Sequence, residues 1–135
     1  MSDEGMRETA SSLFLRLDFG DGRRLGPGKI ALLEAIGAHG SIVAAAKALG
    51  MSYRRAWLLT DELDRMFEEP VIVTYPGRRG TGTEITPFGQ RLIAIYRAME
   101  RQSAKATRGA VDELNRSLAK DYQPRPAAVS APKAG

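Results

Sequence analysis

Two arginine pairs in the sequence are placed where they could bind an acidic partner. Arg54 and Arg55 stand near the start of a predicted helix, and Arg78 and Arg79 lie in the glycine-rich segment 76–82. An arginine side chain can bind a guanine edge or a phosphate through two hydrogen bonds. The sequence contains no recognisable pairing of a nucleophile with a base and no recognisable cluster of metal ligands. We therefore expect no catalytic and no metal-binding residues. The two pairs therefore predict nucleic-acid binding rather than catalysis.

The first pair belongs to a segment, residues 40–67, with the pattern of a helix-turn-helix. Ser41 is suited to cap a first helix and Ser52 a second, because a serine hydroxyl accepts a hydrogen bond from an amide of the first turn. Residues 49–51 form the turn, and the central glycine supplies a positive φ. The small side chains of residues 44–46 let the two helices cross closely. The second helix of such a motif is the one that enters a DNA groove.

Charge is arranged along this second helix in an order that costs helix stability. The two arginines lie in its first turn, and acidic residues follow: Asp61, Glu62, Asp64, Glu68 and Glu69. The helix dipole favours the opposite order. Docking the N-terminal end of the helix on DNA would account for the arrangement, because basic side chains then meet phosphates and bases. A solvated amphipathic helix with scattered charge is the alternative.

The apolar side of the same helix is expected in the core. Its stripe, with spacings of three and four residues, is Ala56, Leu59, Leu63 and Met66. Trp57 is also expected to be buried, because it is a large apolar residue in mid-helix. For Tyr53, donation of its hydroxyl to a phosphate and packing of its ring are both open.

The second arginine pair lies between two predicted strands, residues 71–75 and 83–86. The segment 76–82 would be the tip of a hairpin. A basic, glycine-rich hairpin after a helix-turn-helix is a wing, whose arginines can lie along phosphates or enter a minor groove. A phosphate-binding nucleotide loop would open a helix and carry Gly-Lys-Ser/Thr, and this segment does neither. A merely mobile hairpin tip is the other alternative.

Two elements ahead of residue 40 are predicted to be scaffold. Apolar and polar residues alternate over 13–19, which predicts a half-buried strand. A helix is expected from Pro27 to a left-handed stop at Gly40. Its core-facing residues are Ile30, Leu32, Leu33 and Ile36. His39, the only histidine, is expected near the end of this helix and not in a metal or catalytic site.

A long helix, residues 87–118, is predicted to end the domain. Thr86 can cap it, and Pro87 fits its first position. At 1.5 Å per residue it would extend about 48 Å, more than so small a domain can cover, so we expect a second copy of the chain to cover the rest. Gly109 is where the helix could kink or end. The residues expected in the dimer interface are Leu92, Ile95, Tyr96, Met99, Ala106, Val111 and Leu114.

The length, composition and charge of the whole chain limit the number of domains and the class of protein. Its 135 residues predict one domain, residues 12–118, between a disordered lead (1–11) and a disordered tail (119–135) rich in proline and alanine. The chain has no cysteine, which excludes a disulfide framework. Its net charge of +4 is compatible with a polyanionic partner. Because we find no secretory signal and no apolar run long enough to cross a bilayer, we expect a cytoplasmic protein without a membrane partner.

Four stretches of the sequence resemble a known family: Leu25-Gly26-Pro27-Gly28-Lys29, Gly40-Ser41-Ile42, Ser52-Tyr53-Arg54-Arg55-Ala56-Trp57 and Ile85-Thr86-Pro87-Phe88-Gly89-Gln90-Arg91-Leu92. Together with the order of elements, they resemble the N-terminal domain of the ModE family of molybdate-responsive transcription regulators. More distantly, they are similar to the DNA-binding domain of LysR-type regulators. The resemblance implies a mainly α fold with a small β component, a winged helix-turn-helix with a long C-terminal dimerisation helix. It also implies a homodimer that binds a roughly palindromic operator in double-stranded DNA.

The sequence departs from this family in two respects. Arginine and threonine interrupt a wing that is nearly all glycine in the family, which favours phosphate contact. Family members continue into an oxyanion-binding module, whereas this sequence ends in the proline-alanine tail. We therefore expect no cofactor and no molybdate site of its own. An effector, if the protein responds to one, would act through an unidentified site or an effector-binding protein.

The residues expected to contact DNA lie on the predicted helix-turn-helix and wing: Ser41, Lys47, Ser52, Tyr53, Arg54, Arg55, Arg78, Arg79, Thr81 and Thr83. The main hypothesis is a sequence-specific transcription regulator without enzymatic activity. The alternative is a winged-helix module that binds protein and does not read DNA, since a fold does not determine a function. The salt dependence of duplex binding separates the two hypotheses.

Overall fold

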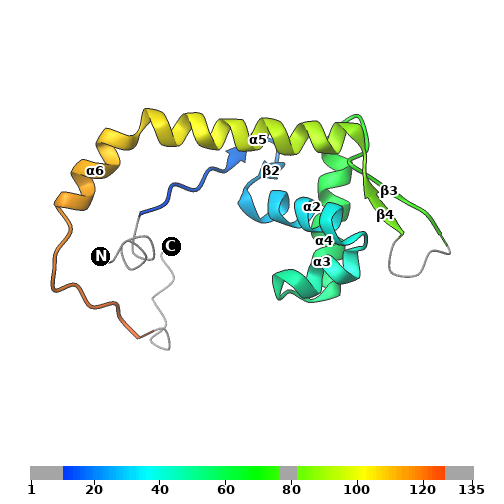
Figure 1. The fold of residues 1–135 in the computed structure, drawn as a ribbon, viewed down its shortest axis with the longest axis horizontal. Coiled ribbons are helices and arrows are strands. Elements are labelled where there is room, and N and C mark those ends of the chain that lie inside the picture. The colour runs from blue at the N-terminus through cyan, green and yellow to red at the C-terminus, as the bar shows by residue number, and fades with distance from the viewer. Residues whose placement is uncertain (1–10, 77–81, 127–135) are drawn as a thin grey trace. The chain divides into compact units, whose positions relative to one another are not determined.

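The computed structural model describes residues 11–76 and 82–126, and these fall into two units that are considered separately. The larger unit, residues 12–106, is mainly helical and contains two small antiparallel sheets (Figure 1). Its elements are β1 (Leu17–Asp18), β2 (Arg24–Leu25), α2 (Pro27–His39), α3 (Ile42–Leu49), α4 (Tyr53–Met66), β3 (Ile72–Thr74), β4 (Thr83–Ile85) and α5 (Pro87–Ala106). The other unit holds α6 (Arg108–Arg116).

The strand predicted over residues 13–19 is much shorter than expected. Only β1 pairs with β2, with Leu17 opposite Leu25 and Asp18 opposite Arg24. The chain turns back at once through Gly20 and Gly22, both at positive φ. Since the returning strand is equally short, most side chains before it are exposed, and the prediction of a half-buried strand was wrong.

Helix α2 forms as its sequence predicts. Pro27 opens it, and Gly40 ends it in a left-handed conformation with φ 80°, from which its N–H donates to the carbonyl of Ile36 over 2.8 Å. The four aliphatic residues predicted to face inward are all buried: Ile30, Leu32, Leu33 and Ile36. His39 is the last residue of the helix, as predicted. The helix therefore provides the surface against which the other elements pack.

Two groups of buried side chains lie on different sides of α2. One group joins α2, α3 and α4 through Leu32, Ile36, Ala45, Ala46 and Ala56. Its alanines let the three helices approach closely, as the sequence suggested. The other group joins α2, α4 and α5 to the chain around β3: Leu25, Ile30, Leu33, Leu63, Met66, Val71, Leu92 and Tyr96. The core thus holds α3, α4 and the β3–β4 hairpin to one scaffold helix.

Val71, just before β3, forms hydrogen bonds through both its backbone N–H and its backbone carbonyl. Its N–H donates to Oδ1 of Asp64 over 2.8 Å, and its carbonyl accepts from the N–H of Thr86 over 3.0 Å. The hydroxyl of Thr86 donates to the carbonyl of Pro70 and accepts from the N–H of Gly89, so Thr86 caps α5 as predicted. Backbone amides and carbonyls are therefore paired where α4, the hairpin and α5 meet.

Helix α5 uses part of its predicted interface inside the chain itself. Leu92 and Tyr96 are 5% and 0% exposed and belong to the core, and the Tyr96 hydroxyl donates to the carbonyl of Leu15. Burial, followed by the nearby charge of Glu100, raises the pKa of Tyr96. The prediction that Leu92 and Tyr96 form a dimer interface is corrected, because the chain's own core already covers both side chains. Ile95 is 42% exposed on the same helix.

The continuous helix predicted over residues 87–118 is interrupted. Helix α5 ends at Ala106 and α6 begins at Arg108, because Thr107 between them adopts φ −103° and ψ 5°. The break thus falls at a β-branched residue, which resists the helical conformation more than most, and not at the predicted Gly109, which lies within α6. Helix α6 buries none of its residues, and Leu114 on it is exposed.

The described residues contain neither a membrane-spanning helix nor a group of metal-ligating side chains. No helix in residues 11–76 and 82–126 is both long enough and apolar enough to cross a membrane. Within the same ranges, no three histidine, aspartate or glutamate side chains are grouped closely enough to hold a metal ion.

Gly89 generates a prediction about stability. A Cβ at this position would lie 2.4 Å from the carbonyl oxygen of Val71 and 2.7 Å from Cγ2 of Ile85. Gly89→Ala should therefore lower the free energy of unfolding by about 1–3 kcal/mol, since the tightly held backbone cannot move away cheaply. The matched control is Gly28→Ala in α2, where nothing lies within 4 Å and a gain of about 0.5–1 kcal/mol is expected. Urea denaturation measures both, and similar values for the two variants would contradict this account.

Candidate nucleic-acid interface

The turn between α3 and α4 is built by the residues that the sequence singled out. Ser41 accepts a hydrogen bond from the N–H of Ala44 over 3.0 Å and caps α3. Gly50 ends α3 in a left-handed conformation with φ 69°. Ser52 accepts from the N–H of Arg55 over 3.1 Å and caps α4. The caps and the glycine are local signals, and all three predictions are confirmed.

The N-terminal end of α4 presents basic and aromatic side chains to solvent. Tyr53, Arg54 and Arg55 are exposed, and the first turn of the helix has no acidic residue. Neither arginine forms an ion pair with any residue in the described part of the chain. Lys47 on α3 is also exposed. This end of α4 therefore carries positive charge that its described surroundings do not neutralise.

The acidic residues of α4 are engaged elsewhere in the same unit. Asp61 pairs with Arg65 at 3.0 Å, and Glu62 pairs with Lys29 at 3.2 Å. Asp64 accepts from the backbone amides of Val71 and, at 3.3 Å, Ile72. The negative charges of the helix thus lie beyond its second turn and already have partners.

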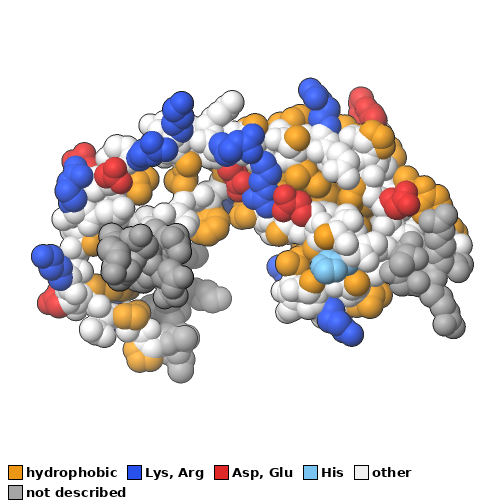
Figure 2. All heavy atoms as spheres, in the orientation of Figure 1, with side chains coloured by type: hydrophobic (Ala, Val, Ile, Leu, Met, Phe, Trp, Pro, Cys, Tyr) orange, Lys and Arg blue, Asp and Glu red, His pale blue; other side chains and the backbone are white. Residues whose placement is uncertain are grey.

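Other basic residues are matched by acidic ones. Arg97 pairs with Glu34 and with Glu100, each at 2.6 Å, and Figure 2 shows blue and red side chains next to one another over the middle of α5. Arg23 pairs with Asp21 at 2.6 Å, and its hydrogen bonds lower the pKa of that carboxyl to about 2. Arg54 and Arg55 differ from these two arginines in forming no ion pair with any described residue.

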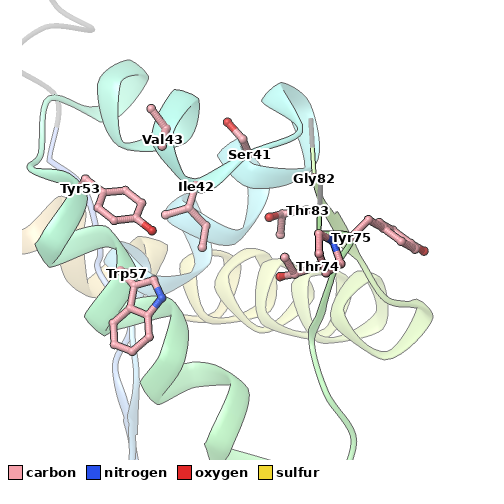
Figure 3. A pocket seen from close by; sticks show the side chains of 10 residues that line it. Ser41, Ile42, Val43, Tyr53, Trp57, Thr74, Tyr75, Gly82 and Thr83 are labelled. Atoms are coloured by element: carbon pink, nitrogen blue, oxygen red, sulfur yellow. The ribbon is translucent and has the colours of Figure 1, made fainter. Parts of the chain in front are cut away.

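A pocket of about 340 Å³ lies between the start of α3, the first two turns of α4 and the hairpin (Figure 3). Val43 lines it from α3, and Tyr53 and Trp57 line it from α4. Thr74 and Thr83 contribute from the two strands of the hairpin. In Figure 3 the hydroxyl of Tyr53 and the indole nitrogen of Trp57 point toward the hairpin side of this pocket. The pocket is thus open, partly aromatic and adjacent to the basic end of α4.

Trp57 is not in the core, and that prediction was wrong. It is 45% exposed, and its neighbour Leu58 is 47% exposed. The buried side of α4 is formed instead by four other residues: Ala56, Thr60, Leu63 and Met66. The Thr60 hydroxyl donates to the carbonyl of Ala56 over 2.7 Å, which satisfies it without leaving the helix. Trp57 lies outside this buried stripe, so its side chain faces outward.

The other residues predicted to contact DNA differ in how exposed they are and in whether they already have hydrogen-bond partners. Thr83 is 6% exposed, and its N–H donates to the carbonyl of Gly40 over 3.0 Å, so it serves mainly to tie β4 to the end of α2. Little of its side chain is therefore accessible to a partner. Ser41 is buried and occupied as a helix cap. Three further predicted contacts lie outside the described residues: Arg78, Arg79 and Thr81.

The chain is similar in sequence to several known proteins. No family model matches the chain. It is 38% identical over 110 residues to the molybdenum transport protein ModE of Azotobacter vinelandii, which covers 81% of this chain and 41% of that protein. It is 41% identical over 95 residues to the molybdenum-pterin-binding protein MopB of Rhodobacter capsulatus, or 70% of this chain and 35% of the relative. These similarities support a relationship with the ModE family.

A third relative is the DNA-binding transcriptional dual regulator ModE of Escherichia coli strain K12. The chain is 36% identical to it over 81 residues, which cover 59% of this chain and 31% of the regulator. The chain spans between 31% and 41% of the lengths of these three relatives. The names of the ModE and Mop relatives describe transport, pterin binding and regulation rather than an enzymatic reaction.

Asp64 generates a prediction about how the hairpin is held. Asp64→Ala would leave the amides of Val71 and Ile72 without their acceptor, and Val71 is fully buried. The free energy of unfolding should fall by about 1–3 kcal/mol. Hydrogen exchange at these two amides should become faster.

The matched control for this prediction is Asp61→Ala on the same helix. It removes only an exposed pair with Arg65, worth about 0.3–0.5 kcal/mol. Equal losses in the two variants, or unchanged exchange at residues 71 and 72, would show that Asp64 does not anchor the hairpin.

Proposed function

We propose that this chain is a winged helix-turn-helix module of a transcription regulator of the ModE type, in which α3 and α4 bind DNA. Helix α4 would be the recognition helix, and the β3–β4 hairpin would be the wing. The observation that carries this proposal is the pair Arg54 and Arg55, which lie exposed and unmatched at a helix N-terminus. The relationship with a regulator described as DNA-binding supports it.

The charge distribution suits insertion of α4 into a major groove by its first turns. Arg54 would reach base edges or phosphates, because a guanidinium can bind guanine through two hydrogen bonds. Arg55, Lys47 and the Tyr53 hydroxyl would contact the phosphate backbone and set the orientation. Since the acidic residues of α4 lie further along the helix and have partners, they would not oppose this approach.

We further propose that the chain acts as a homodimer. A symmetric pair would place two recognition helices in successive major grooves about 34 Å apart on an operator of approximate two-fold symmetry. With Leu92 and Tyr96 committed to the core, the remaining candidates for the interface are Ile95, Met99, Ala106, Val111 and Leu114. We assign no effector, because the relatives' names that mention molybdenum describe proteins of which this chain spans two-fifths or less.

Removing the two arginines tests DNA binding. Arg54→Ala/Arg55→Ala should weaken binding to the preferred duplex by about 1–3 kcal/mol for each arginine that contacts a base. Each lost phosphate contact should also reduce the slope of log K against log salt by about 0.9. Affinity is measured by fluorescence anisotropy of a labelled duplex over a series of salt concentrations.

The matched control is Arg24→Ala/Arg65→Ala, which removes the same charge from two exposed ion pairs. Its affinity should stay near that of the unmodified chain. If both double variants lose affinity equally, the effect is one of net charge and the assignment of α4 fails. If the unmodified chain binds no duplex even at low salt, the DNA-binding proposal itself is wrong and a protein-binding module takes its place.

A substitution at Ile95 tests whether the chain forms the proposed dimer. Ile95→Asp places a charge on an exposed apolar position of α5 and should shift the chain from dimer to monomer, because a buried unpaired carboxylate is costly. The control is Ala94→Asp, an exposed position one residue away on a different side of the helix. Sedimentation velocity measures both. An unmodified chain that is monomeric at high concentration would contradict the proposal.

A further inference from the structure

We propose that Trp57 and Leu58 read the C5-methyl groups of thymines that neighbour the base pair contacted by Arg54. The inference rests on the proposed function and adds an apolar half to the surface with which α4 would read DNA. The major-groove edge of thymine differs from that of every other base in carrying a methyl group, which apolar side chains recognise by contact.

The exposure of these two side chains is the first observation. Trp57 and Leu58 are large and apolar, yet close to half of each is accessible, while other residues of the same helix form its buried side: Ala56, Thr60, Leu63 and Met66. An isolated exposed leucine needs no explanation. Trp57 and Leu58, however, are adjacent to each other and lie beside two arginines without ion pairs. Together they form a mixed apolar and basic surface, which suits a groove that displays both methyl groups and hydrogen-bond acceptors.

The positions of the side chains on the helix are the second observation. Trp57 and Leu58 follow Arg54 by three and four residues, so they lie one turn further along the same exposed face, on either side of it. One turn advances about 5.4 Å, and successive base pairs are about 3.4 Å apart. The two side chains would thus meet bases one or two steps from the one that Arg54 contacts.

Each side chain opens onto a hollow that a methyl group could enter. Trp57 lines the pocket between α3, α4 and the hairpin (Figure 3). Leu58 lines a separate hollow of about 180 Å³ together with Arg54 and Arg55. The arginines therefore border the apolar surface and would hold the DNA against it.

A second copy of this chain is a poorer occupant of the same surface. A symmetric contact there would bring Arg54 and Arg55 of both copies together, and the first turn of α4 has no acidic residue to offset them. The positive border instead matches a polyanion.

The test removes methyl groups from DNA and side chains from the protein independently. A preferred duplex is first selected from random duplexes by binding to the full chain. Each thymine of that duplex is then replaced in turn by deoxyuridine, which lacks only the methyl group. Affinities are measured for the unmodified chain, for Trp57→Ala and Leu58→Ala, and for Tyr122→Ala as an exposed aromatic control outside the unit that contains α4.

The unmodified chain should lose roughly fourfold in affinity for each contacted methyl group that is removed. Trp57→Ala or Leu58→Ala should abolish that ratio at one thymine position each, while Tyr122→Ala should keep it. Arg54→Ala should weaken binding to the thymine and the uracil duplex alike and leave the ratio unchanged. Because both α4 side chains are half exposed, thermal unfolding of the variants should show that they fold.

Three outcomes would overturn the inference, and they differ from failure of the proposed function. If the chain binds a selected duplex but tolerates uracil at every position, methyl reading is wrong and DNA binding stands. If a preference for thymine persists in both alanine variants, another residue reads the methyl group. If no duplex can be selected at all, the proposed function fails first.

Discussion

The position of the hairpin relative to the helices depends on how the backbone of Val71 is held. Asp64 from α4 binds its amide, Thr86 binds its carbonyl, and the absence of a side chain at Gly89 lets α5 approach that same carbonyl. Helix α4, the hairpin and α5 thus meet at the backbone of one residue. The pocket between α4 and the hairpin is lined by Trp57 on one side and Thr74 on the other. Its width is set by this junction, because the junction fixes the hairpin relative to α4.

The electrostatic arrangement of α4 follows from the same junction. An acidic residue late in a helix is unfavourable for the helix dipole, but Asp64 offsets this by binding two amides that would otherwise lack partners. Asp61 and Glu62 each have a basic partner. The arginines of the first turn have no such role within the described chain. The acidic residues of the helix therefore have partners within the described chain, and Arg54 and Arg55 do not form ion pairs there.

Local features of this fold could be predicted from the sequence, and features that depend on what covers a surface could not. Ser41, Gly50 and Ser52 were identified because caps and left-handed turns are determined within a few residues. Trp57 was misplaced because the prediction relied on the size and hydrophobicity of its side chain, whereas its position lies outside the buried stripe of α4. Leu92 and Tyr96 form an apolar seam in the sequence, but a seam does not say whether the chain itself or a second copy covers it. Leu58 was not considered as a site residue, although the predicted stripe of Ala56, Leu59, Leu63 and Met66 already leaves it outside the buried side.

Trp57 is the only tryptophan of the chain and lies on the exposed side of α4, away from both groups of core side chains. The intrinsic indole emission of this protein therefore comes from a single place. A molecule that covers α4 would shield the exposed part of this indole and should shift the wavelength of that emission. Tryptophan fluorescence would thus report directly on whether this face of α4 is occupied.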